Sequence, residues 1–152
     1  MPSNLVQQRI EKRLFIEQLL DPGQLKPYTI PVPISATLRK YQQDGVNWLA
    51  FLRKYQLNGI LCDGKIHYTQ LYILNTIDMG LGKTLQTICI LAGDIFERAE
   101  KFKIDPKEKP LPALVVCPTT VTGHWYHEIL KFTSSDILKP LIYIGSSNKR
   151  AK

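Results

Sequence analysis

One short segment near the middle of the chain limits the possible folds more than any other. It reads Asp78-Met79-Gly80-Leu81-Gly82-Lys83-Thr84. Glycines let the backbone bend so that successive N–H groups face one anion, and a helix that begins at the lysine directs its positive dipole end to the same place. We therefore predict a nucleotide phosphate-binding loop in which Lys83 reaches the β- and γ-phosphates and the Thr84 hydroxyl ligates Mg²⁺.

The match to the full pattern of such loops is partial. The pattern G-x-x-x-x-G-K-[ST] requires a glycine where this chain has Ile77. A chance arrangement of these residues in an ordinary loop is one alternative on this segment alone. Another P-loop enzyme, a GTPase or a small-molecule kinase, is a second alternative. A GTPase would carry [NT]-K-x-D for guanine, but residues 148–151 read Asn-Lys-Arg-Ala and lack the aspartate.

Composition narrows the class of protein and of partner. The 152 residues are 44% hydrophobic and 22% charged, which is typical of a globular chain. No apolar run approaches the roughly 18–20 residues of a membrane span. The formal net charge of +7 favours a polyanionic partner. Cys62, Cys89 and Cys117 lack C-x-x-C spacing, which indicates free thiols in a reducing compartment; a zinc site of Cys117, His124 and His127 is the alternative.

Hydrophobic periodicity predicts helices that alternate with short apolar segments. Helices are expected where apolar side chains recur at helical spacing, at residues 3–20, 38–55, 83–101 and 121–132. Buried strands are expected at the short apolar runs 59–62, 113–117 and 141–144. This alternation predicts an α/β fold with a mostly parallel sheet flanked by helices. Residues 1–36 form a lead-in, in which an extended proline strap (residues 24–36) follows the first helix.

Three segments, taken in order, resemble the motifs of one enzyme family. The run Leu38-Arg39-Lys40-Tyr41-Gln42-Gln43-Asp44-Gly45-Val46-Asn47-Trp48-Leu49 is similar to the glutamine motif of Swi/Snf-type remodelling enzymes. Residues 78–84 resemble their phosphate loop, and residues 114–118, with Trp125 and Glu128, resemble the next motif, which faces DNA. Within the family, residues 17–22 and 30–34 look most like the branch that strips TATA-binding protein from DNA.

The resemblance implies a fold, a function and a set of site residues. It implies an incomplete RecA-like P-loop NTPase lobe at residues 37–152, part of an ATP-dependent DNA translocase that remodels protein–DNA complexes in the nucleus. Its partners would be double-stranded DNA and TATA-binding protein, and its cofactors ATP and Mg²⁺. Gln42 would read adenine, because an amide both donates and accepts hydrogen bonds. The DNA-contact candidates are Pro118, Thr119, Thr122 and the basic Lys131.

Each of these roles has a plainer alternative in the residues themselves. Gln42 could equally be an exposed helix residue. Thr119 and Thr122 could simply cap a helix, and Lys131 could be a solvated surface charge. Only the order and spacing of the three motifs favour the functional interpretation.

The sequence departs from the family pattern in two places. No Asp-Glu pair follows Cys117, and the second lobe with its arginine is missing. We therefore expect no competent ATPase from this chain alone, and a truncated, non-catalytic interaction module is an alternative. Residues 64–77 are the second departure, because without them the sequence reads G-I-L-C-D-D-M-G-L-G-K-T, as in the family. Codons at both boundaries can carry splice signals, so we interpret this segment as a retained intron; a genuine loop insertion is the alternative.

Overall fold

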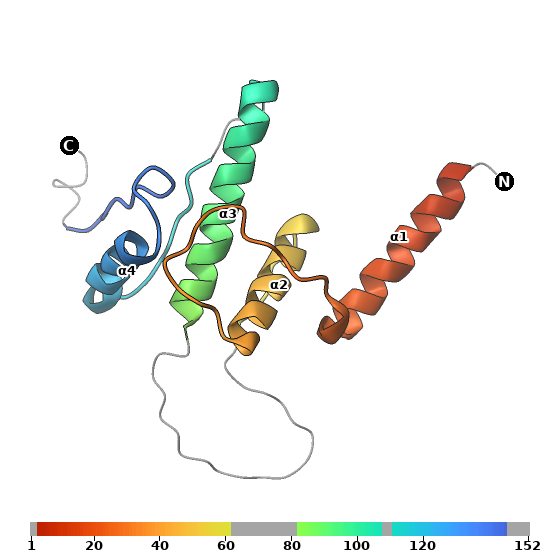
Figure 1. Cartoon of the computed structure of the whole chain (residues 1–152), viewed down its shortest axis with the longest axis horizontal. Helices are drawn as coiled ribbons and strands as arrows, with labels where there is room; N and C mark the ends of the chain where they lie inside the picture. The colour runs from red at the N-terminus through yellow and green to blue at the C-terminus, as the bar shows by residue number, and fades with distance from the viewer. Residues whose placement is uncertain (1–2, 62–81, 108–110, 146–152) are drawn as a thin grey trace, which may run out of the picture.

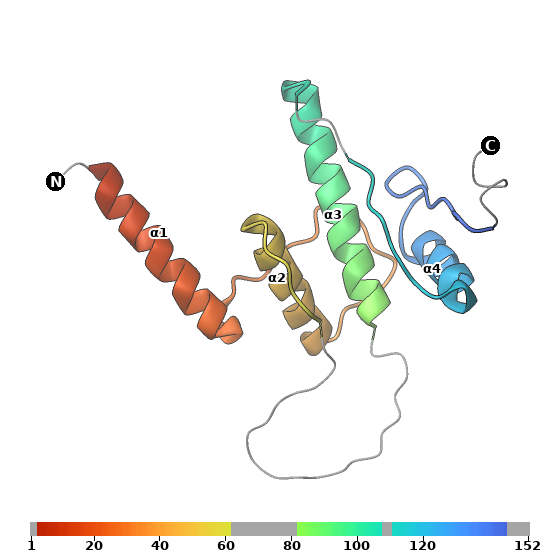
Figure 2. The same ribbon diagram turned by 180° about the vertical axis from the view of Figure 1, so that it is seen from behind.

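In the computed structural model, the described residues are 3–61, 82–107 and 111–145. Their helical elements are α1 (Ser3–Leu20), the short 3-10 helix η1 (Pro22–Gln24), α2 (Lys40–Lys54), α3 (Lys83–Ile104) and α4 (Thr119–Phe132). The long α3 stands in the middle, with α2 on one side of it and α4 on the other, and α1 leads away from this group (Figure 1). The view from behind in Figure 2 shows the same order.

The four predicted helices are confirmed, with small differences at their ends. α1 ends at Leu20, because Asp21 accepts a hydrogen bond from the Gly23 N–H at 3.0 Å and Pro22 begins the 3-10 helix. α2 begins after Arg39. α3 continues to Ile104, three residues beyond the expected end, with lysines in its last turn where positive charge suits the helix dipole.

The predicted parallel sheet, and with it the RecA-like arrangement of strands flanked by helices, is wrong for the residues that the structure describes. Residues 59–61, 113–117 and 141–144 are not strands, and no backbone hydrogen bond between described residues joins any two of these segments. Their apolar side chains are largely exposed, as for Leu114 at 86% and Leu141 at 89%. A short apolar run indicates a preference for burial, but it cannot supply the neighbouring strand that pairing requires.

The hydrophobic core lies around α3, against which α2, α4 and the proline strap pack. Val46 of α2 and Ile88, Cys89 and Ala92 of α3 are completely buried. Val32 of the strap packs against Ile88 and Ala92. Burial of each large side chain stabilises the fold by roughly 1.5–3 kcal/mol. The strap is therefore held as a third layer on the helix pair, in agreement with its interpretation as an extended segment on a surface.

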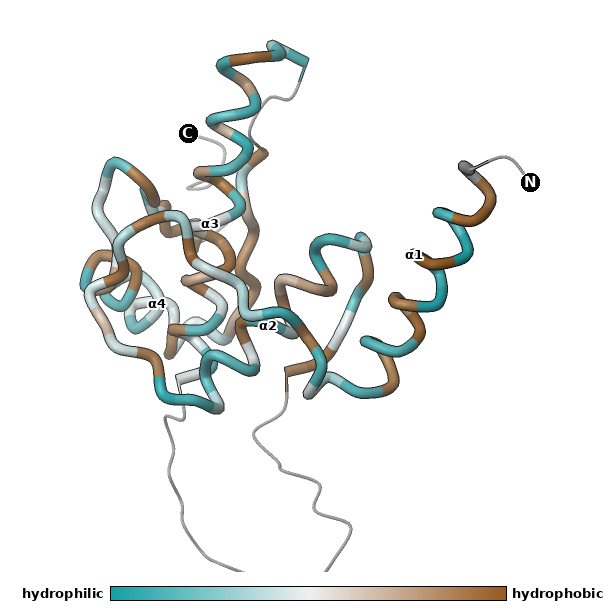
Figure 3. The backbone as a smooth tube through the Cα atoms, turned by 45° about the vertical axis from the view of Figure 1, so that its right-hand side comes forward, coloured by the Kyte–Doolittle hydropathy of each residue, from teal (hydrophilic) through white to brown (hydrophobic). Residues whose placement is uncertain are grey.

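The helix α1 contacts this core mainly through one aromatic residue. The ring of Phe15 stacks on Phe51, with 5.8 Å between the centroids, and meets Tyr55 edge-on at 4.7 Å. Most other apolar side chains of α1 are about half exposed, and they alternate irregularly with hydrophilic residues along the helix (Figure 3). No helix in the described part of the chain combines the length and the apolar content needed to cross a membrane.

A polar cluster ties the strap to both helices. The Tyr28 N–H donates to Asn47 Oδ1 at 2.8 Å, and the Tyr28 hydroxyl donates to Glu97 Oε1 at 2.7 Å. Arg53 of α2 pairs with Asp94 at 3.2 Å and with Glu97 at 2.5 Å, both on α3. Burial, aided by the hydrogen bond to Glu97, raises the pKa of Tyr28 to about 12. The protonated hydroxyl of Tyr28 therefore links the strap to α3, while the Tyr28 backbone N–H links it to α2.

The substitution Tyr28→Phe tests this link. It keeps the ring and removes the hydroxyl, so we expect the free energy of unfolding in urea to fall by about 1 kcal/mol at neutral pH. Since the pKa rises from 10.0 to about 12 on folding, the contribution is complete below pH 10 and is lost as the pH rises to 12. The difference between wild type and variant should therefore narrow over that interval.

Tyr41→Phe provides the matched control. Tyr41 is 36% exposed, and its hydroxyl makes no hydrogen bond to another described residue. We expect this variant to unfold like the wild type. An equal loss of stability in both variants, or a difference that persists undiminished at pH 12, would contradict the role of the Tyr28 hydroxyl.

Candidate nucleotide-binding site

Part of the predicted phosphate loop lies at the start of α3. Gly82 precedes the helix with φ of 80°, a left-handed conformation that glycine adopts without strain. Its carbonyl accepts the Gln86 N–H at 2.9 Å. Lys83 and Thr84 thus occupy the first turn, where N–H groups have no acceptor within a helix. The other predicted loop residues, Asp78, Met79, Gly80 and Leu81, lie outside the described residues, as does the segment 64–77.

The charge and chemistry of this helix end suit an anion. α3 has 22 residues, and none of the residues in its first turn is acidic, so no side chain of that turn opposes the helix dipole. Lys83 is exposed and Thr84 is half-buried. Backbone N–H groups, an ammonium group and a hydroxyl are the groups that a magnesium-bound triphosphate requires. The residues present therefore fit ATP with Mg²⁺.

Gln42, the residue predicted to read adenine, lies against the same helix end. Its side chain is buried, at 8% exposure, and its Oε1 accepts the Arg39 N–H at 2.8 Å. A Cβ atom added to Gly82 would overlap with Gln42 Nε2. The alternative of an exposed helix residue is therefore wrong, and the glutamine motif meets Gly82 of the predicted phosphate loop where α2 packs on α3.

A second contact between these helices was missed by the sequence analysis. Gln86 of α3 is buried, at 3% exposure, and it lies on Gly45 of α2. A Cβ atom on Gly45 would overlap with the Gln86 amide oxygen and lie 3.0 Å from its Cδ. Two signals could have pointed to it: a glycine inside a predicted helix, and a polar residue next to Leu85 on an apolar face.

Three of the four predicted DNA-contact residues lie at the start of α4. Pro118 is the N-cap residue, Thr119 begins the helix, and Thr122 donates to the Pro118 carbonyl at 3.4 Å. No side chain caps α4, so the capping alternative for Thr119 and Thr122 is wrong. Lys131 is exposed near the other end of the helix, with its ammonium 5.0 Å from the Phe132 ring centroid.

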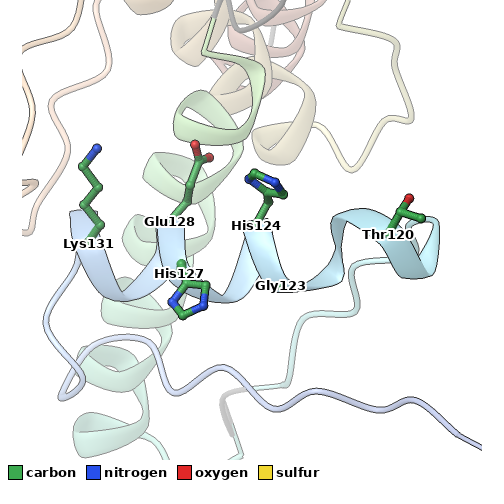
Figure 4. Close-up of a pocket in the computed structure, with 6 residues that line it drawn as sticks. All are labelled: Thr120, Gly123, His124, His127, Glu128 and Lys131. Carbon is green, nitrogen blue, oxygen red and sulfur yellow. The ribbon is translucent and has the colours of Figure 1, made fainter.

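A shallow hollow of about 340 Å³ follows the exposed face of α4. It is lined by Thr120, Gly123, His124, His127, Glu128 and Lys131. His124, Glu128 and Lys131 point to one side of the helix, whereas His127 points to the other (Figure 4). The helix α4 lies across α3 from α2 (Figure 1). The structure therefore keeps the DNA-contact candidates apart from Gln42.

The zinc alternative is not supported. Among the described residues, no three His, Cys, Asp or Glu side chains are grouped as metal ligands. The Cys117 sulfur instead lies 3.7 Å from the Thr122 hydroxyl, and His127 packs edge-on against Tyr126. Cys89 and Cys117 are free thiols, as predicted, and burial raises the pKa of Cys89 to about 11. Cys62 lies outside the described residues.

Comparison with known proteins decides the family. The model of the SNF2-related domain matches residues 41–152. The chain belongs to the SNF2-related domain family. It is 53% identical over 154 residues to human TATA-binding protein-associated factor 172, an alignment that covers 100% of this chain and 8% of that protein. The chain is also 49% identical to TATA-binding protein-associated factor mot1 of Schizosaccharomyces pombe, covering 100% of this chain and 7% of that protein.

A more distant relative is Helicase SWR1 of Candida albicans, at 36% identity over 89% of this chain and 7% of that protein. The resemblance to Swi/Snf-type enzymes, and to the branch associated with TATA-binding protein, is confirmed. This SNF2-related chain spans less than a tenth of the length of these relatives. The family match includes α2, α3 and α4, and so all of the described candidate residues.

Proposed function

We propose that this chain supplies the ATP-binding face of a Swi/Snf-type, ATP-dependent DNA translocase. The observation that carries the proposal is the contact of the buried Gln42 with Gly82 at the start of α3. Residues from two separate family motifs are thereby adjacent, at a helix end whose N–H groups, Lys83 and Thr84 are suited to phosphates. Hydrolysis of ATP is not part of this proposal, because the chain spans only 8% of the length of its human relative.

Each residue has a defined task in this proposal. Gln42 hydrogen-bonds the edge of adenine, and its amide is held for this by the Arg39 N–H. The first-turn N–H groups and Lys83 bind the β- and γ-phosphates, with residues 78–81 forming the rest of the loop. The Thr84 hydroxyl holds Mg²⁺, which when bound neutralises charge on the phosphate oxygens.

The proposed partners follow from the relatives and from charge. Relatives named TATA-binding protein-associated factors support a complex of TATA-binding protein and double-stranded DNA as the target, and a nuclear location. Within this chain, Pro118, Thr119, Thr122 and Lys131 contact the phosphate backbone without reading sequence. The net charge of +7 supports that role.

A second candidate function is an interaction module without catalysis. The exposed apolar side chains of α1 favour it, among them Leu5, Val6, Ile10 and Leu14. Such a face suits contact with another protein surface. Nucleotide binding separates the two candidates, because an interaction module requires none.

Calorimetric titration with a non-hydrolysable ATP analogue and Mg²⁺ tests the proposed site. Lys83→Ala should weaken binding by about tenfold or more, since a charged hydrogen bond contributes roughly 1.5–3 kcal/mol. Deletion of residues 64–77 should tighten binding, because it shortens the segment between α2 and α3 that must be ordered around the phosphates, and ordering each extra residue costs about 1–2 kcal/mol. Lys83→Ala should abolish that gain.

Lys101→Ala is the control, because Lys101 lies in the last turn of the same helix. Its affinity for the analogue should equal that of the wild type. Wild-type affinity in the Lys83 variant would contradict the site. Equal affinity with and without residues 64–77 would show that this segment does not impair the loop.

Fluorescence anisotropy with a random DNA duplex tests the α4 face. Binding should be weak, at a Kd of about 10⁻⁴–10⁻⁶ M, and should fall steeply with salt because each neutralised phosphate releases counterions. Lys131→Ala should lower the affinity for all sequences and reduce the salt slope by about 1, while Lys101→Ala on α3 should change neither. Affinity independent of salt, or a strong preference for one sequence, would rule out this use of α4.

A further inference from the structure

Two glutamine–glycine contacts join the starts of α2 and α3. Gln42 of α2 lies on Gly82, and Gln86 of α3 lies on Gly45. In both pairs, a Cβ atom on the glycine would overlap with the glutamine amide. Both glutamines are buried, so neither side chain is simply resting on the surface. The contacts are reciprocal, because each of the two segments contributes one glutamine and one glycine, and each glutamine lies against the glycine of the other segment.

The spacing of these residues means that the two contacts together fix the register of α2 relative to α3. Gln42 and Gly45 are three residues apart on α2, and Gly82 and Gln86 are four apart, so each pair shares one helix face. The apolar cluster around Val46, Leu85 and Cys89 fills the same interface. A close-packed interface with two such points resists sliding or rotation of α2 against α3, because either movement would force one side chain into the facing backbone.

This register affects the position of Gln42 more than that of the other proposed nucleotide-binding residues. Lys83 and Thr84 belong to α3, so their positions relative to the first-turn N–H groups do not depend on α2. Gln42 belongs to α2, and its distance from the phosphate-binding end of α3 is set by how closely the helices pack. Gly45 permits this close packing, and Gln86 fills the space that the missing side chain leaves.

We propose that Gln86, through its contact with Gly45, is a positioning residue that places Gln42 for recognition of adenine. The inference rests on the proposed ATP-binding function. In it, Gln86 acts on the base through the placement of α2, and the phosphates are bound by α3 itself. Adenine recognition and phosphate binding are thus separable by a change at Gly45.

The substitution Gly45→Ala tests this separation in the whole chain. The added Cβ overlaps with the buried Gln86 amide, so Gln86 must shift and its contact with α2 is changed. Alanine favours the helix more than glycine does, so lost helix propensity cannot explain an effect. Affinities for MgATP and for inorganic triphosphate, which carries no base, are measured by calorimetry. We expect the ratio of the two affinities to fall roughly three- to tenfold, the size of one lost hydrogen bond, with triphosphate affinity unchanged.

Two further variants control the experiment. In the Gln86→Ala background the Cβ added at Gly45 meets no amide, so the double variant should lower the ratio no further than Gln86→Ala alone does, because contacting residues are not additive. Gly123→Ala in α4 adds a Cβ with no heavy atom within 4 Å, and should leave the ratio unchanged. If the helical circular dichroism signal of Gly45→Ala is lost, Gln86→Ala is used in its place. We expect it to lower the ratio of MgATP to triphosphate affinity by the same amount.

The contradicting outcomes are distinct. An unchanged ratio in folded Gly45→Ala overturns the inference, and so does an equal loss of ATP and triphosphate affinity, because a merely structural contact would affect both. A wild type that binds both ligands equally shows that Gln42 does not read the base, which also overturns the inference while leaving phosphate binding in place. A wild type that binds neither ligand overturns the proposed function itself.

Discussion

The packing of α2 on the first two turns of α3 is the interaction on which the rest of the structure depends. The same contact buries Val46 and Cys89 completely and brings Gln42 to the glycine that begins α3. Core and candidate site are therefore one interface. A change that loosens the core at this end also moves a proposed nucleotide contact, which explains why a buried glutamine is tolerated where an apolar residue would fill space more simply.

The ion pairs between α2 and α3 lie at one end of this helix pair, and the candidate nucleotide site lies at the other. The ion pairs of Arg53 with Asp94 and Glu97 lie away from the start of α3 and are partly exposed, so each contributes little on its own. Glu97 also accepts a hydrogen bond from the Tyr28 hydroxyl, so the same carboxylate contacts both Arg53 and the strap. The first turn of α3 contains no acidic side chain. No carboxylate of that turn therefore opposes the positive end of the helix dipole.

Local patterns in the sequence were sufficient to predict the helices and the beginning of α3. Gly82 before Lys83 specified both a left-handed residue and a helix start, and the apolar spacing through Ile88 specified the buried face. The prediction of a sheet was wrong for the described residues, because strand pairing depends on neighbours that a run such as residues 113–117 does not encode. Leu114 in that run is exposed.

The candidate site was predicted only in part, for a related reason. Gln42, Lys83 and Thr84 were found from motifs, each within one segment of the chain. The contact of Gln86 with Gly45 joins two segments, and its geometry depends on the register of two helices that no single segment specifies. Glycine within a helix was the visible sign, but the side chain that it accommodates became known only from the packed structure.

Hydrogen exchange of the 152-residue chain, with and without MgATP, tests the central claim most directly. If the α2–α3 contact builds one nucleotide site, peptides covering residues 39–46 and 82–89 should gain protection together, by roughly tenfold or more, because the bound ligand stabilises both against local opening. Peptides from α4 should exchange as before. Protection of residues 82–89 alone, or of neither segment, would contradict the claim.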